Sequence, residues 1–232
     1  MIWWREEMTT LRTIWDGFDF SYLLSILLGV IPSLMCITLH ELAHGYTAFL
    51  LGDDTAKRAG RLTLNPLKHL DPIGLLMMLV FRFGWAKPVP VNMMKFRYPK
   101  RGMAVTALAG PACNLLITVV FLFLYGALLV PFSGSQAGKV FLEGIELTAY
   151  ISLGFCIFNL IIVPPLDGSK VLFSLLPDTL YLKLMHYERY GSLVLLLLVW
   201  TGLLGKPLGK LISMVFSSLW PIAQGAFHMV NG

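Results

Sequence analysis

The 232-residue chain has few charged residues, and this scarcity decides its class. Only 13% of the residues are Asp, Glu, Lys or Arg, whereas 56% are hydrophobic, and the mean hydropathy is +0.73. Several apolar stretches approach the roughly 20 residues that cross a bilayer as a helix. A soluble globular domain is therefore excluded, and we expect an integral membrane protein. The net charge of +5 is concentrated in one segment, so nucleic acid is not an expected partner and the lipid bilayer is.

Cysteine is also scarce. Cys36, Cys113 and Cys156 each lie inside an apolar run, and no two of them form a C-x-x-C pair. A disulfide framework is therefore excluded, and we expect the three thiols to pack as small apolar side chains. Only Cys36, one helical turn before His40, stays open as a metal ligand.

The residues between 35 and 51 carry the most distinctive chemistry of the chain. His40-Glu41-Leu42-Ala43-His44 is an H-E-x-x-H motif in an apolar, helix-forming run. At about 100° per residue, His40 and His44 lie one turn apart on the same helix face, where both imidazoles can bind one Zn²⁺. Glu41 projects on that side and can act on a water without being a ligand. The alternative is a structural pair of buried histidines, but three ionisable groups in one turn of a membrane-length run are costly without a function.

Four apolar stretches and an apolar tail predict the membrane segments. Their ranges are 20–51, with Pro32 as a kink or a helix start, 103–130, 145–163, 193–204 and the tail 207–230. Gly52 is expected to end the first helix, and the tail either spans the membrane or lies in its interface. We expect an all-α polytopic membrane protein in which residues 1–232 form a single domain. Its core covers about 20–176, and C-terminal helices cover about 190–230.

The segment 53–101 differs from the rest because it holds ten of the eighteen Lys and Arg residues against three aspartates. It contains two extended-looking pieces, 61–64 and 88–91, and an apolar piece, 73–83, that is too short to span a bilayer. We expect a re-entrant or β-like loop that folds over the metal site from the cytosolic side. A surface loop that binds anionic lipid headgroups is the alternative. The positive-inside rule then places the N-terminal stretch and a loop at 131–144 outside.

A zinc hydrolase needs a third protein ligand, and Asp167 is the best candidate. It follows Pro164-Pro165 at the end of the third apolar stretch, where a carboxylate is costly unless it is paired or metal-bound. The alternative role is the N-cap of a helix that begins near Gly168. Asn159, about two turns upstream, is a candidate oxyanion donor or an interhelical hydrogen-bonding group, with the two roles weighed equally. For Asn114 the interhelical role is favoured.

Taken together, these motifs resemble the site-2 protease family of intramembrane zinc metalloproteases. The similarity rests on H-E-L-A-H at 40–44, G-P-x-x-N at 110–114 and N-x-x-x-x-P-P-x-D-G at 159–168. Residues 65–67 and 84–91 also resemble loop segments of the small bacterial branch, and no PDZ-like domain is expected between the spans. The resemblance implies a three-helix catalytic core and a multi-pass protein of the bacterial cell membrane, with its active site reached from the cytosol.

The resemblance further implies zinc bound by His40, His44 and Asp167, and cleavage of peptide bonds in or near transmembrane segments of membrane protein substrates. We expect zinc to activate a water and Glu41 to act as general base, with Asn159 assisting. Two other classes remain as alternatives. A metal transporter would show repeated intramembrane carboxylates or histidines, which the sequence lacks, and a catalytically inactive adaptor would not need Glu41.

Overall fold

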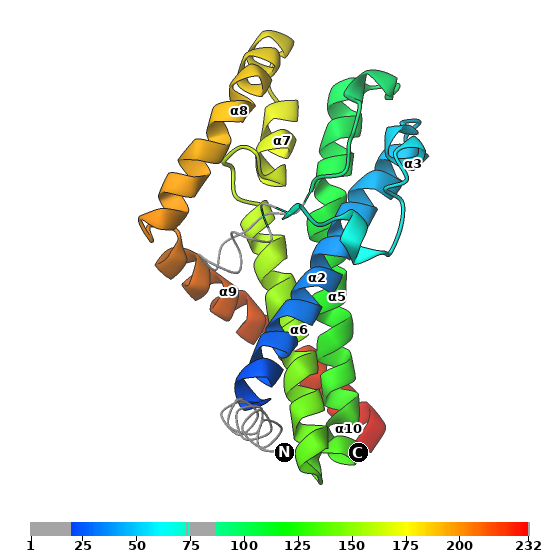
Figure 1. The fold of residues 1–232 in the computed structure, drawn as a ribbon, viewed down its shortest axis with the longest axis vertical. Coiled ribbons are helices and arrows are strands. Elements are labelled where there is room, and N and C mark those ends of the chain that lie inside the picture. The colour runs from blue at the N-terminus through cyan, green and yellow to red at the C-terminus, as the bar shows by residue number, and fades with distance from the viewer. Residues whose placement is uncertain (1–19, 73, 75–86, 232) are drawn as a thin grey trace, which may run out of the picture.

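The computed structural model describes residues 20–72, 74 and 87–231, and this part of the chain is built from helices without a β-strand (Figure 1). The four long helices are α2 (Phe20–Leu50), α5 (Pro99–Ser133), α6 (Gln136–Asn159) and α8 (Asp178–Trp200). The shorter helices are α3 (Thr55–Arg58), α7 (Asp167–Ser174), α9 (Gly205–Leu219) and α10 (Pro221–Asn231), with 3₁₀ turns at Pro66–Lys68 and Met93–Lys95. The predicted all-α class is confirmed. The expected re-entrant piece 73–83 lies almost wholly outside the described residues.

Two of the described helices, α5 and α6, are long and apolar enough to cross a membrane. A third span is present if Tyr190–Trp200 and Gly205–Asn231, which meet at an angle of 84°, are counted as one broken segment. The chain is therefore a membrane protein. Helix α2 runs obliquely across α5 and α6 and packs against both (Figure 1).

Helix α2 passes through Pro32 without interruption, so the predicted first segment is one continuous helix. It ends as expected just before Gly52, whose φ of +104° suits a residue without a side chain. The N–H groups of Gly52 and Asp53 donate to the carbonyls of Phe49 and Ala48, which closes the last turn.

The predicted loop at 131–144 is wrong, because only Gly134 and Ser135 separate α5 from α6. The Ser135 side chain accepts a hydrogen bond from the N–H of Gly138 and so caps α6. A Cβ on Gly138 would lie 1.9 Å from the carbonyl oxygen of Phe132, so glycine is what lets the two helices meet this closely. The polar residues between the spans continue the helices instead of forming a loop.

The third predicted segment, 145–163, also ends earlier than expected, because α6 stops at Asn159. Proline disfavours a helical conformation in the residue before it and cannot donate a backbone hydrogen bond, so the chain leaves the helix ahead of Pro164-Pro165. It re-enters a helix at Asp167, the first residue of α7. A Cβ on Gly168 would lie 2.2 Å from the carbonyl oxygen of Leu160, so this glycine allows α7 to start directly against the end of α6.

The C-terminal part folds back along the core. The predicted stretch 193–204 corresponds to the second half of α8, which ends at Trp200, and to the turn that follows. Helix α8 begins at Asp178, whose side chain accepts a 3.0 Å bond from Lys100 Nζ at the start of α5. The tail forms α9 and α10. Helix α10 packs so closely on α5 that a Cβ on Gly126 would lie 1.9 Å from the Ala223 carbonyl oxygen.

Candidate metal centre

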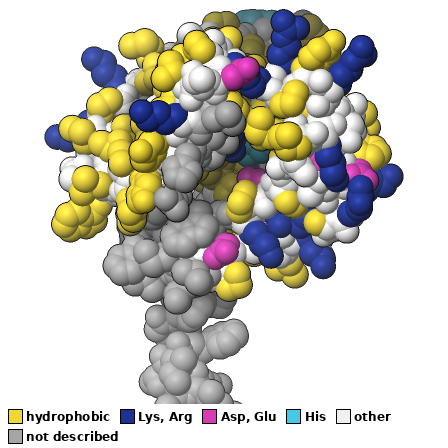
Figure 2. Space-filling model, turned by 90° about the horizontal axis from the view of Figure 1, so that it is seen from above, with side chains coloured by type: hydrophobic (Ala, Val, Ile, Leu, Met, Phe, Trp, Pro, Cys, Tyr) yellow, Lys and Arg dark blue, Asp and Glu magenta, His cyan; other side chains and the backbone are white. Residues whose placement is uncertain are grey.

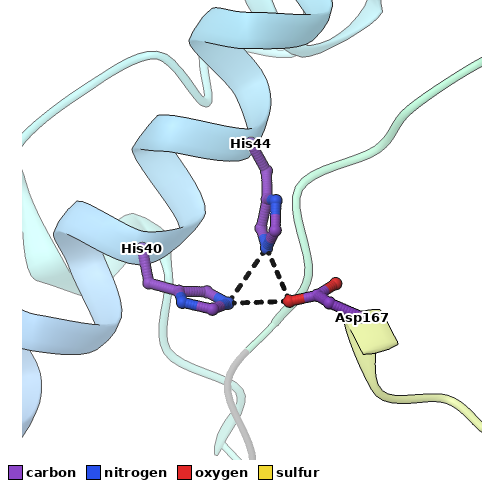
Figure 3. A group of neighbouring side chains, drawn as sticks. All are labelled: His40, His44 and Asp167. Atoms are coloured by element: carbon purple, nitrogen blue, oxygen red, sulfur yellow. Dashed lines mark hydrogen bonds and ion pairs between the residues drawn. The ribbon is translucent and has the colours of Figure 1, made fainter. Parts of the chain in front are cut away.

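Three side chains that are far apart in sequence meet in the interior between α2 and α7 (Figure 3). His40 and His44 project from one face of α2, and Asp167 faces them from the first turn of α7. The two Nε2 atoms lie 2.9 Å apart, and Asp167 Oδ2 lies 3.2 Å from Nε2 of His40 and 3.1 Å from Nε2 of His44. All three residues are buried, with 6%, 8% and 6% of their surface exposed. They form the one group of potential ligands found among the described residues.

This arrangement fits a divalent cation. Nitrogen and oxygen donors about 2.0–2.2 Å from one tetrahedral Zn²⁺ lie roughly 3.3–3.6 Å from one another, a few tenths of an ångström more than the separations seen here. Asp167 Oδ2 is buried and has no hydrogen-bond donor within the described part of the chain. A buried carboxylate oxygen facing two imidazole nitrogens is costly unless a cation or a proton lies between them. The donor set, two imidazoles and one carboxylate, is one that zinc hydrolases use.

Helix α5 lies directly behind both imidazoles. His44 Nδ1 is 2.7 Å from the carbonyl oxygen of Thr106, and His40 Nδ1 is 3.1 Å from the Asn114 amide. Gly110 lies midway between these two residues, and a Cβ there would be 2.5 Å from His40 Cε1 and 2.5 Å from His44 Nε2. The absence of a side chain at Gly110 therefore makes room for both rings. The interhelical role favoured for Asn114 agrees with this contact between α5 and α2, although the sequence did not identify His40 as its partner.

Asp167 is not the N-cap of α7, since Leu166 occupies that position and makes no side-chain cap bond. This removes the competing structural role that the sequence suggested. The other carboxylate oxygen, Oδ1, lies 3.8 Å from Lys170 Nζ on the next turn of α7. From outside the ligand cluster, Lys170 therefore offsets part of the free-energy cost of burying this carboxylate.

Two other candidates lie outside the cluster. Cys36 is a fully buried free thiol and is not a member of the ligand group. Asn159 donates from Nδ2 to the carbonyl oxygen of Phe155 at 3.0 Å, a bond within the last turn of α6. The structure thus brings His40, His44 and Asp167 together. Asn159 lies apart from them, at the end of α6.

Glu41 is half-buried and has a backbone partner that the sequence did not reveal. Its Oε2 accepts a 2.8 Å hydrogen bond from the N–H of Val89. Val89 is flanked by Pro88 and Pro90, which have no N–H, so Val89 is the one backbone donor among residues 88–90. The predicted extended piece 88–91 is not part of a β-strand, but it crosses the H-E-x-x-H motif and holds its glutamate.

The piece around Val89 is itself held at both ends. The carbonyl oxygen of Lys87 accepts a 2.6 Å bond from Arg61 Nη2, and the N–H of Lys87 donates to the carbonyl of His69. At the other end, the N–H of Asn92 donates to Asp53 Oδ2 at 2.6 Å. Burial opposes ionisation of Asp53, but hydrogen bonds from Thr55 and Asn92 hold its pKa below the ordinary value. These fixed points give Glu41 a defined orientation.

Curated proteins with related sequences are named as zinc metalloproteases. The chain is 39% identical over 197 residues to "Putative zinc metalloprotease YwhC" of Bacillus subtilis. The matched region covers 83% of this chain and 84% of that protein. It is 30% identical over 190 residues to "Putative zinc metalloprotease Rip2" of Mycolicibacterium smegmatis, covering 80% of this chain and 71% of that protein. No protein-family model matches the chain, and no solved structure matches it significantly. With this similarity along most of its length, the chain belongs to the site-2 protease family of intramembrane zinc metalloproteases.

Proposed function

We propose that His40, His44 and Asp167 hold the catalytic zinc of this protease and that Glu41 is its general base. The observation that carries the proposal is the convergence of three buried donor atoms, each within 3.2 Å of the other two. The substrates we propose are transmembrane segments of other membrane proteins, cut in or near the bilayer. The relatives are named for the same metal and the same class of reaction.

Zinc, when bound, supplies Lewis acidity that polarises the scissile carbonyl and makes water a stronger acid. The remaining chemistry belongs to the chain. Val89 holds Oε2 of Glu41, so Oε1 is left to take a proton from the attacking water and deliver it to the leaving amine.

Asn159 stays a candidate donor to the oxyanion. Its amide NH₂ group has two hydrogens, and one of them is used in the bond to the carbonyl oxygen of Phe155. The second is available for the substrate.

A substrate helix must unwind before attack, because all of its backbone groups are bonded internally. We propose that the unwound segment lies beside Pro88–Val91, which crosses the motif. The prolines lack an N–H and the N–H of Val89 is bound to Glu41. A substrate strand would therefore bond mainly to the carbonyl groups of this piece and to the N–H of Val91.

The catalytic core we propose consists of α2, α5 and α6, within a single domain that includes the C-terminal helices. The face that carries α3 and the start of α5 is proposed to be cytosolic. Lys and Arg side chains are spread over this face (Figure 2), and the exposed ones include Lys57, Arg58, Lys95, Arg97 and Arg101. The two-residue turn at the opposite end of α5 has no charged residue, which fits the positive-inside rule.

Zinc content tests the ligand assignment directly. Purified wild-type protein in detergent should hold about one zinc per chain, and His40→Ala or His44→Ala should lose most of it. Helix content and monodispersity of the variants show whether the fold is kept. Freshly purified wild-type protein that contains no zinc and takes none up would refute the proposal.

A further inference from the structure

We propose that Asn114 is a positioning residue that fixes the ring orientation and the tautomer of His40, so that Nε2 faces the metal. The proposal rests on the assignment of His40 and His44 as zinc ligands. It goes beyond that assignment because it names the group on α5 that makes one of these imidazoles a competent ligand. Asn114 touches no ligand atom of the cluster and acts through His40 alone.

The two ligand histidines face the same requirement. An imidazole that binds a metal through Nε2 carries its proton on Nδ1, and that N–H needs an acceptor. For His44 the acceptor is the carbonyl oxygen of Thr106, 2.7 Å away. A carbonyl can only accept, so this contact fixes the proton on Nδ1 of His44 and points the lone pair of Nε2 into the cluster.

For His40 the corresponding group is the Asn114 side chain, whose amide nitrogen stands 3.1 Å from Nδ1. The two amide atoms are nearly the same size, and half a turn of the side chain exchanges them. With Oδ1 turned toward His40, the amide accepts the proton of Nδ1, as the carbonyl of Thr106 does for His44. Oδ1 has no hydrogen-bond partner among the described residues in its present position, so no bond made there opposes this turn.

The position of Asn114 is fixed by its neighbours. The residue is fully buried, and its own carbonyl oxygen accepts a 2.8 Å bond from Ser152 Oγ of α6. Thr106, Gly110 and Asn114 recur every fourth residue, so they lie on one face of α5. That face places a backbone carbonyl beside one imidazole and a side-chain amide beside the other, and it leaves empty space for both rings at Gly110. A side-chain amide, unlike the backbone carbonyl of Thr106, can be removed by mutation, which makes this support testable.

The experiment compares zinc affinity in three variants, measured by competition with a chelator for Zn²⁺ alone, without substrate. Asn114→Leu keeps a similar shape but has no acceptor. Asn114→Asp keeps an acceptor oxygen at the same position. Thr118→Val is the matched control. Thr118 lies one turn farther along α5 than Asn114, and its buried hydroxyl donates to the carbonyls of Asn114 and Ala149. Ser152 still holds the Asn114 backbone in that control.

We expect Asn114→Leu to bind zinc about 10–100-fold more weakly than wild type, the usual effect of losing the hydrogen-bond partner of a metal ligand. Asn114→Asp should recover zinc affinity to within a few-fold of wild type. Thr118→Val should lower the melting temperature of the protein but leave zinc affinity unchanged.

The inference is overturned if Asn114→Leu binds zinc as tightly as wild type, or if Thr118→Val weakens binding equally, which would indicate general loosening of the helix pair. It is also overturned if Asn114→Asp folds but binds zinc as weakly as Asn114→Leu. Should Asn114→Asp not fold, the difference between Asn114→Leu and Thr118→Val decides alone. Failure of the ligand assignment looks different, because wild-type protein would then hold no zinc at all.

Discussion

Glu41→Gln separates the chemistry of the site from its architecture. Glutamine has nearly the shape of glutamate, and its side-chain oxygen can still accept the hydrogen bond that Val89 donates at 2.8 Å. The position of the side chain and the path of residues 87–92 should therefore be kept. What is lost is the ability to take a proton from water, because an amide is not a base at neutral pH.

The expected loss follows from this one missing step. General base catalysis contributes about 10²–10⁴-fold, which corresponds to about 2.7–5.4 kcal/mol of activation free energy at 1.36 kcal/mol per tenfold. Zinc content should stay at the wild-type level, because Glu41 is not a member of the ligand group. The assay is cleavage of a model transmembrane substrate reconstituted in vesicles, with zinc measured on the same preparations.

Glu143→Gln is the matched control, since it removes the same charge from an exposed position on α6. It should cleave at the wild-type rate. The assignment of Glu41 fails if Glu41→Gln loses zinc as His40→Ala does, or if it still cleaves within a few-fold of wild type. A substrate that stays bound but uncut in membranes containing Glu41→Gln would identify what the protease acts on.

Three further outcomes are expected. Asp167→Asn should weaken zinc binding at least as much as the 10–100-fold loss seen for outer partners of metal ligands, and full zinc occupancy with normal cleavage would remove Asp167 from the site. Cysteines placed near Lys57 and Lys100 should react only with cytosolic labelling reagents, and one near Ser135 only with external reagents; the opposite pattern would invert the proposed orientation. Asp53→Asn should lower thermal stability at neutral pH, because hydrogen bonds hold the pKa of the buried carboxylate below its ordinary value of 3.8 in the folded protein. That stability is present above pH 3.8 and is lost as pH falls through the folded pKa, so melting temperatures of variant and wild type should converge in acid; a constant gap would refute it.

Features of the site that depend only on residues close together in the sequence could be predicted, because short sequence spacing determines their relative positions. Two histidines four residues apart must share a helix face, and a diproline must break a helix before an aspartate can turn inward. The predicted end of the first helix at Gly52 is confirmed for the same reason, since a glycine with positive φ is a local signal. The residues of the candidate site could thus be identified from short motifs.

The features that the sequence did not predict correctly depend on how the helices pack against one another. The length of the turn between α5 and α6 is set by the close approach of Gly138 to Phe132, and residue patterns do not reveal which glycine will meet which carbonyl. The partners of Glu41 and His40 are 48 and 74 residues away in sequence, and they come together only after the helices pack. The G-P-x-x-N motif marked the right stretch of α5, but it did not say which histidine its asparagine would meet.

The distribution of these contacts explains why three ionisable side chains can be tolerated in the interior. Both histidines are supported from α5, so their ring positions depend on the packing of α2 on α5. Asp167 arrives separately, on an eight-residue helix that Gly168 allows to start against the end of α6 and that places Lys170 beside the second carboxylate oxygen. A cation bound by all three would therefore join α2 to α7 across the core. The cost of burying each polar group is met by a different neighbour, so the site is complete only when α2, α5 and α7 are all in place.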